Sequence, residues 1–376
     1  MANTELVSSD VTHVCISSSS DSPGGENSNV TLQRGGATSS VQKDPSDGVP
    51  FIRTYLQRQG LSHDTISIIM NSWRGGTQKQ YKTYLLKYME YCTRLGRDPL
   101  LPNIGTVLDF LKLLFDSGCG YSAINTARSA LSAVLILPSG MPVGQHPLVK
   151  RFLRGIFNLR PSLPRYQHVW DVKIVLDYLE SLGKNEELSL KTLTLKFSML
   201  LALVSGQRSQ SLQLLSLDNM SRVGSKVVFV LTSLVKQSRP GVHVQPIEIE
   251  AFENENLCVV KCLEAYVSRT EHIREGKQLL VSFNAPHRAV TRETISRWLR
   301  LTLAAAGIDT TIYSGHSTRA ASTSAAHMQG APMQCIMGAA GWASAGVFAR
   351  FYCKPMHKEH SFGEAVLSSS NLANPL

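Results

Sequence analysis

The feature that most constrains the fold is a helical repeat of apolar residues that begins soon after Pro50. In residues 75–96, GGTQKQYKTYLLKYMEYCTRLG, tyrosine, leucine and cysteine side chains recur at steps of three and four positions. This spacing places them on one face of an α-helix. Thr77 and Gln80 have the spacing of a capping box, and Gly96 predicts the end of the helix.

Three further helices are predicted before residue 160, within 102–118, 122–137 and 146–159. The stretch RPSLPRY, residues 160–166, contains two prolines that oppose helix formation, so we expect a short, extended linker there. The chain therefore begins its folded part as an all-helical domain.

Beyond the linker the helical pattern is interrupted once. Asp171, Gly206 and Thr291 mark predicted helix ends, whereas residues 225–250 alternate and are β-branched on both sides of KQSRPG. This pattern predicts a β-hairpin with Lys236 in its turn. The predicted fold class is mainly α with a small β-hairpin or sheet, an α+β arrangement.

The predicted domains follow from these shifts in composition. Residues 1–48 are rich in Ser and Gly and contain no aromatic residue, so we expect a disordered tail. A helical domain at 49–160, a linker at 161–168, a second domain at 169–365 and a C-terminal tail at 366–376 complete the chain.

Charge is concentrated in the helical domain. Residues 51–165 contain fifteen basic and five acidic side chains, an excess equal to the net charge of +10 of the whole chain. Such an excess indicates a polyanionic partner, although a solvated basic surface would give the same count. The candidate binding residues are Arg74, Lys79, Lys82, Arg128, Lys150, Arg151, Arg154 and Arg165.

Several classes of protein are disfavoured. The sequence has no run of 18 apolar residues, and its N-terminus lacks the basic and apolar regions of a secretion signal. Cys258 and Cys262 form a single pair without a second pair at zinc spacing, so we interpret them as reduced thiols. No acidic cluster suits magnesium, and we expect no metal and no cofactor.

His316 and Arg319 lie three residues apart at a predicted helix start, and small residues follow them. Two neighbouring cations repel each other, so this placement requires either an exposed surface or a shared anion. Arg208 follows the Gly206 break, and Trp342 precedes Tyr352 by ten residues. Taken singly, each of these residues has an ordinary structural explanation.

The ordered set of Arg208, Lys236, the H-x-x-R pair, Trp342 and Tyr352 resembles the catalytic set of the tyrosine recombinase (phage-integrase-like) family. The resemblance covers residues 51–360. The entry S-W-R-x-x-T at residues 72–77 and the ending W…F-x-x-F-Y-x-K-P look like recombinases of eukaryotic mobile elements, of the Crypton and DIRS kinds.

The resemblance implies a helical core-binding domain followed by a catalytic domain, and chemistry at a DNA phosphate. Arg208 and Arg319 would hold the non-bridging oxygens, because guanidinium groups match their geometry. His316 would contact the phosphate or assist proton transfer, and Trp342 offers an indole N–H. Tyr352 would be the nucleophile of a 3′-phosphotyrosine intermediate, and Lys236 would protonate the leaving oxygen.

Three points stay open in the sequence. Lys226 competes with Lys236 as the general acid, and Lys236 itself could be a solvated turn residue. Ser211 stands where the family often has an acidic residue. The spacing from Trp342 is one residue longer than usual and would select Phe351, but only Tyr352 can be a nucleophile.

The expected function is therefore site-specific DNA recombination or integration without metal. The alternatives are a DNA-binding protein with a recombinase fold but no chemistry, and a type IB topoisomerase-like relaxing enzyme. The expected partner is double-stranded DNA, bound by a homotetramer because recombination joins two duplexes. We expect a nuclear protein that does not associate with membranes.

Overall fold

A computed structural model describes residues 50–162, 166–241, 244–342 and 344–353, apart from the side chains of Phe51 and Phe351. The expected tails and the candidate Arg165 lie outside these residues. The chain divides into two compact units, Met1–Leu163 and Pro164–Leu376. Among the described residues, no helix combines the length and the apolar character needed to span a membrane.

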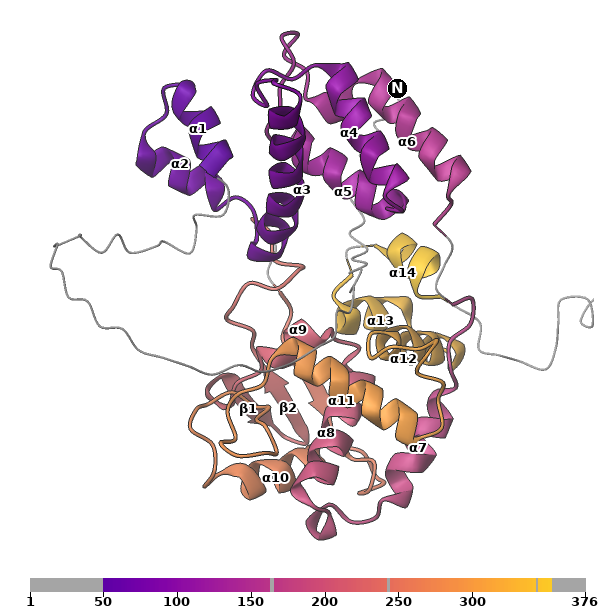
Figure 1. The fold of residues 1–376 in the computed structure, drawn as a ribbon. Coiled ribbons are helices and arrows are strands. Elements are labelled where there is room, and N and C mark those ends of the chain that lie inside the picture. Colours follow the sequence, from indigo (N-terminus) through magenta and orange to yellow (C-terminus); the bar gives the residue numbers. More distant parts are fainter. Residues whose placement is uncertain (1–49, 163–165, 242–243, 343, 354–376) are drawn as a thin grey trace, which may run out of the picture. The chain divides into compact units, whose positions relative to one another are not determined.

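The first unit is helical and has its own core (Figure 1). Its helices are α1 (Pro50–Arg58), α2 (His63–Met70), α3 (Gly75–Arg94), α4 (Ile104–Asp116), α5 (Tyr121–Ser132) and α6 (Pro147–Leu159). The core joins Leu85 and Tyr88 of α3 to Phe110 of α4, Leu131 of α5 and Ile156 of α6. The predicted apolar face of α3 is thus the buried one.

The small residues of α5 allow close packing. Ala127 and Ala130 are fully buried on the side of α5 that joins the core. The turn at Gly144 also lies against this helix, where an added Cβ would come within 2.5 Å of the Cδ of Arg128. Only glycine leaves that space. Arg128 is consequently half-buried, and its guanidinium donates to the side chain of Asn125 at 2.7 Å.

The predicted start of α3 is wrong. The helix begins at Gly75, with Arg74 as its N-cap residue, and Arg74 makes no capping hydrogen bond through its side chain. Thr77 is therefore already the third residue of the helix, so the Thr77–Gln80 pair cannot form a capping box. Two glycines precede it, and helical backbone continues through both of them.

The second unit combines helices with a three-stranded sheet (Figure 1). Its helices are α7 (Val172–Ser181), α8 (Leu190–Ser205), α9 (Ser209–Gln213), α10 (Val259–Thr270), α11 (Arg292–Ala305), α12 (Ser317–Met328), α13 (Met333–Ala340) and α14 (Ala345–Phe351). Apolar α8 is the centre of the core, and α10, α11 and α12 pack against it. The predicted caps Asp171 and Thr291 accept backbone N–H groups, and α8 ends at Gly206 as predicted.

The sheet contains the predicted hairpin, with a longer connection and one additional strand. Strands β1 (Met220–Val223), β2 (Lys226–Phe229) and β3 (Ile247–Glu250) are antiparallel in the order β1-β2-β3. The strands on both sides of KQSRPG do pair, with Phe229 opposite Ile247. KQSRPG is nevertheless only part of the longer connection between these two residues. The alternation in the sequence extends past Phe229, but the ladder does not, and β1 pairs with the other edge of β2.

Candidate active site

Arg319 is a buried guanidinium that main-chain carbonyl groups hold in place. It belongs to the first turn of α12 and is 2% exposed. Nη1 donates to the carbonyl oxygen of Gly206 at 2.6 Å, and Nη2 donates to that of Ala340 at 2.5 Å. Burial, and then repulsion from Arg208, lower the pKa of Arg319 to about 9, so the group stays charged at neutral pH.

The small residues of α12 explain how this helix lies so close to its neighbours. Ala320, Ala321, Thr323 and Ser324 are all buried. The Oγ of Ser324 donates to the carbonyl oxygen of Tyr352 at 2.6 Å, which ties α12 to the end of α14. Larger side chains on this face would separate Arg319 from the segments that carry its partners.

Arg208 approaches the same point from another segment. It is the N-cap residue of α9, two residues beyond the end of α8 at Gly206. Its charge is close enough to lower the pKa values of both His316 and Arg319. Ser211, where an acidic residue was considered, is buried one turn along α9.

His316 stands among cations at the N-cap position of α12. His316 is exposed to solvent, yet desolvation by the protein atoms around it and repulsion from three cations lower the pKa of His316 to about 4. These cations belong to Arg208, Arg319 and Lys236. Desolvation and the three positive charges all favour the uncharged ring, so His316 is neutral at pH 7.

The rings of Trp342 and Tyr352 pack against each other and against the guanidinium of Arg319. Their ring centroids lie 4.6 Å apart, and the guanidinium carbon of Arg319 lies 4.8 Å from the Trp342 ring and 5.4 Å from the Tyr352 ring. The His316 ring is 6.5 Å from that of Tyr352. Tyr352 is half-buried at the C-cap of α14, so its phenol belongs to the same cluster as the cations.

Three buried N–H groups of this cluster have no hydrogen-bond partner among the described residues. They are Nη1 of Arg208, Nε of Arg319 and Nε1 of Trp342. A buried donor left unpaired costs about 1–3 kcal/mol. All three are donors, and two carry positive charge, so an anion with several oxygen atoms would satisfy them.

The structure separates the two lysine candidates. Lys226 lies in β2, where its ammonium is 2.6 Å from Glu250 and 3.6 Å from Glu248, and hydrogen bonding to Glu250 raises the pKa of Lys226. Lys236 lies in the β2–β3 connection, and its charge acts on His316. Lys236 therefore belongs to the cluster, whereas Lys226 is held by carboxylates of β3.

Tyr313, the nearest other tyrosine in sequence, has different surroundings. Its hydroxyl donates to the carbonyl oxygen of His168 at 3.3 Å, and its ring packs against that of Tyr166 at 5.4 Å. Burial raises the pKa of Tyr313, which makes its phenolate harder to form.

The predicted basic residues that the structure describes in the helical unit lie on or next to three of its helices, α3, α5 and α6. On α3, Lys79 is exposed and Lys82 is half-buried one turn further, while Arg74 precedes the helix. On α6, Lys150, Arg151 and Arg154 are exposed. Their spacings of three and four residues place these α6 cations on one side of the helix.

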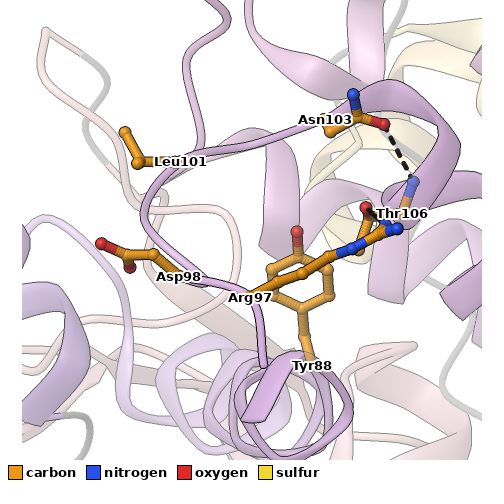
Figure 2. A pocket seen from close by; sticks show the side chains of 6 residues that line it. All are labelled: Tyr88, Arg97, Asp98, Leu101, Asn103 and Thr106. Atoms are coloured by element: carbon orange, nitrogen blue, oxygen red, sulfur yellow. Dashed lines mark hydrogen bonds between the residues drawn. The ribbon is translucent and has the colours of Figure 1, made fainter. Parts of the chain in front are cut away.

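A separate cavity of about 300 Å³ lies in the helical unit between the end of α3 and the start of α4 (Figure 2). Tyr88, Arg97, Asp98, Leu101, Asn103 and Thr106 line it. Arg97 donates to the hydroxyl of Thr106, and Asp98 accepts from Arg58 at 3.2 Å. Its polar groups thus pair within the unit and connect neighbouring helices.

Three residues that hold the cluster together were not predicted. Gln207 donates through Nε2 to the carbonyl of Ala339 at 2.6 Å, and Gln237 donates to that of Ala340 at 3.5 Å. Ser324 holds Tyr352 through the main-chain hydrogen bond of that residue. The sequence offered one signal, since each glutamine adjoins a candidate cation, but the acceptors are main-chain carbonyls that no side-chain pattern marks. No group of three His, Cys, Asp or Glu residues suited to a metal occurs among the described residues.

Comparison with solved structures assigns the fold. The chain is similar to a lambda integrase dimer bound to a COC′ core site, with a TM-score of 0.51 and 16% identity over 82% of this chain and 97% of that one. It is similar to the XerH site-specific recombinase in a post-cleavage complex, with a TM-score of 0.54 and 16% identity over 88% and 97%. The Tn1549 transposon integrase with transposon right end DNA gives 0.53 and 12% over 86% and 99%.

These neighbours share a mostly helical fold with a small antiparallel sheet, and the chain has this tyrosine recombinase fold. The predicted fold class is thereby confirmed. No family model matches the sequence, and no curated protein matches it.

Proposed function

We propose that this chain cuts and rejoins double-stranded DNA as a site-specific recombinase, through a covalent 3′-phosphotyrosine intermediate. One observation carries the proposal. Three buried N–H donors without a hydrogen-bond partner among the described residues, two of them cationic, belong to the same cluster as the Tyr352 phenol. The neighbours of the same fold are bound to DNA, and one is described as a post-cleavage complex, which supports the same partner here.

The cluster provides a binding place for one phosphodiester. Arg208 Nη1, Arg319 Nε and Trp342 Nε1 donate to the non-bridging oxygens. Because negative charge grows on these oxygens during attack, the donors bind the transition state more tightly than the ground state. The two carbonyl contacts of Arg319 fix its plane beforehand, so no reorganisation is needed.

The proposed cleavage step is a single displacement at phosphorus. Tyr352 Oη forms a bond to phosphorus, the bond from phosphorus to the 5′ oxygen breaks, and the DNA 3′ end stays attached to the enzyme. Neutral His316 accepts the phenolic proton, and the Lys236 ammonium donates a proton to the leaving oxygen. Attack by a 5′ hydroxyl on the phosphotyrosine reverses these steps and rejoins the strands.

The basic residues of α3 and α6 would bind the DNA backbone. Since recombination joins two duplexes and cuts both strands of each, we further propose a homotetramer on DNA. The S-W-R-x-x-T entry at residues 72–77 and the W…F-x-x-F-Y-x-K-P ending support an origin in a eukaryotic mobile element of the Crypton or DIRS kind, and hence a nuclear protein. The proposed reaction involves neither a metal nor a membrane.

A suicide-substrate selection tests the proposal without knowledge of the target site. Duplexes with a randomised core and a nick near its centre release a short fragment after cleavage, which leaves the protein trapped on DNA. We expect the wild-type protein and the Tyr313→Phe variant to form an adduct that survives denaturation. Tyr352→Phe should bind DNA equally well and form none.

Each other result has a definite meaning. DNA binding without any wild-type adduct would make the chain a DNA-binding protein of recombinase fold. An adduct whose formation rate per protein molecule does not depend on protein concentration would indicate a relaxing enzyme of the type IB topoisomerase kind. An adduct in Tyr352→Phe would exclude Tyr352 as the nucleophile.

A further inference from the structure

The C-terminal end of α13 receives three side-chain donors from three separate segments. Gln207 donates to the carbonyl oxygen of Ala339 at 2.6 Å, and Arg319 donates to that of Ala340 at 2.5 Å. Gln237 donates to the same Ala340 oxygen at 3.5 Å. The last carbonyls of a helix have no partner within it, so they are available to groups from elsewhere in the chain.

The glutamine of the β2–β3 connection also packs against the turn that follows α13. Gly341 has a φ of +64°, and a Cβ added there would lie 2.9 Å from Nε2 of Gln237. A residue other than glycine would be strained in this conformation and would displace the amide. Gly341 then leads directly to Trp342 of the cluster.

Each glutamine adjoins one cation of the cluster in sequence. Gln207 precedes Arg208, and Gln237 follows Lys236. Neither cation lies within a helix or strand, since Arg208 is the N-cap residue of α9 and Lys236 lies in a long connection. Contacts made by their neighbours in the chain therefore contribute to their positions.

We propose that Gln207 and Gln237 are positioning residues of this site, which place Arg208 and Lys236 by anchoring their segments to the carbonyls of α13. This assignment rests on the proposed function for its catalytic meaning. Arg319 binds the same Ala340 carbonyl directly, so the end of α13 fixes all three cations relative to one another.

The two glutamines should then affect different parts of the reaction. Gln237 places the group that protonates the leaving oxygen, whereas Gln207 places a donor to the non-bridging oxygens. A thiolate leaves without protonation because its conjugate acid is much stronger than an alcohol. Replacing the 5′ bridging oxygen with sulfur should therefore remove the need for Lys236 and not the need for Arg208.

The test uses full-length Gln207→Leu and Gln237→Leu, which keep the side-chain volume and remove the donor, with Ala variants should either Leu variant not fold. Gln245→Leu is the matched control, because Gln245 is exposed in the same β2–β3 connection. On duplexes recovered from the adduct selection, we expect both Gln207 and Gln237 variants to cleave roughly 100-fold more slowly, the scale of a small misplacement. Sulfur substitution should restore Gln237→Leu to near the wild-type rate and leave Gln207→Leu slow.

A second measurement does not depend on cleavage. Arg208 and Lys236 both lower the pKa of His316, so moving either cation away should raise this pKa. Titration of ¹³C-labelled histidines, with His316→Gln for assignment, should show an upward shift in both variants and none in Gln245→Leu. An unchanged His316 pKa in both variants would overturn the positioning role, even for a protein that cleaves DNA. A shifted pKa without any wild-type adduct would support the positioning and refute the proposed function.

Discussion

At the scale of single residues, Arg319 combines a fixed orientation with an unpaired donor. Its terminal nitrogens bind the carbonyls of Gly206 and Ala340, and its Nε has no partner among the described residues. The guanidinium is therefore already placed for the phosphate that the proposed function requires. Lysine has no equivalent of this arrangement, because a single ammonium cannot span both carbonyls and still present a fixed donor.

Arg319→Ala should reduce the rate of adduct formation about 10²–10³-fold, the usual effect of losing one donor to a developing oxyanion. Arg319→Lys should recover little of that loss. The measurement is single-turnover cleavage of the suicide duplex at saturating protein, which separates chemistry from binding. A wild-type rate in Arg319→Ala would remove this residue from the proposed phosphate site.

His316 predicts a pH dependence of binding. Its pKa is lowered to about 4 in the free protein, and a bound phosphate would offset the surrounding cations and raise it. The bound state then takes up a proton that the free state does not, so DNA affinity should increase as the pH falls below the bound-state pKa. The increase should level off near pH 4.

Fluorescence anisotropy with the Tyr352→Phe variant would measure this affinity in the absence of cleavage. The matched variant also carries His316→Gln and should lose the protonation-linked part of the pH dependence. An affinity that changes equally with pH in both proteins would assign the effect to other groups.

Sequence reasoning predicted the members of this cluster better than their contacts. The ordered residues Arg208, His316, Arg319, Trp342 and Tyr352 do lie together, although their catalytic roles remain predictions. Their order could be predicted because the proposed chemistry needs particular side chains. The carbonyl acceptors of Gly206, Ala339 and Ala340 could not be predicted from the sequence. Every residue has a main-chain carbonyl, and only the fold brings these three next to the side-chain donors.

At the scale of secondary structure, α12 depends on small side chains. Ala320 and Ala321 are each 1% exposed, in a helix that contacts α7, α8 and α13. Ala320→Leu should destabilise the protein by about 1–3 kcal/mol through overpacking, whereas Ala325→Leu at a half-buried position should cost less. Urea denaturation would measure both, and equal effects would show that the Ala320 face tolerates larger side chains.

The sequence predicted helix ends correctly where a capping side chain or a glycine marks them. Asp171 and Thr291 cap their helices, and Gly206 ends α8, as predicted. The sequence signals failed where more than one residue could begin a helix or end a strand. Two glycines before Thr77 allowed α3 to begin earlier, and the alternating pattern near Phe229 did not show where the ladder stops.

At the scale of the whole molecule, uneven charge predicts strong salt dependence. The basic excess of residues 51–165 should release many counterions when the protein binds DNA, so affinity should fall steeply with salt. Replacing Lys150 and Arg154 with Gln should lower the slope of log affinity against log salt by about 0.9 for each phosphate that the variant no longer neutralises.

Lys112→Gln is the matched control in the same unit, because Lys112 already pairs with Asp116 at 2.6 Å. Its slope should equal that of the wild type in binding assays between low and moderate salt. A slope unchanged by the Lys150 and Arg154 substitutions would count against α6 as a DNA-binding surface.

At the C-terminal end of α13, a position can be important for the site and still tolerate most substitutions, because its contribution comes from the main-chain carbonyl. The Ala339 side chain is exposed, so most residues can replace it while its main-chain oxygen still accepts from Gln207. Proline at 339 would disturb the helical turn instead, and with it the acceptor. In a library of all single substitutions, most variants at position 339 should therefore keep wild-type activity. Only substitutions that alter the backbone, such as proline, should lose it. A survey of amino-acid variability would overlook this position, although it anchors the segment that carries Arg208.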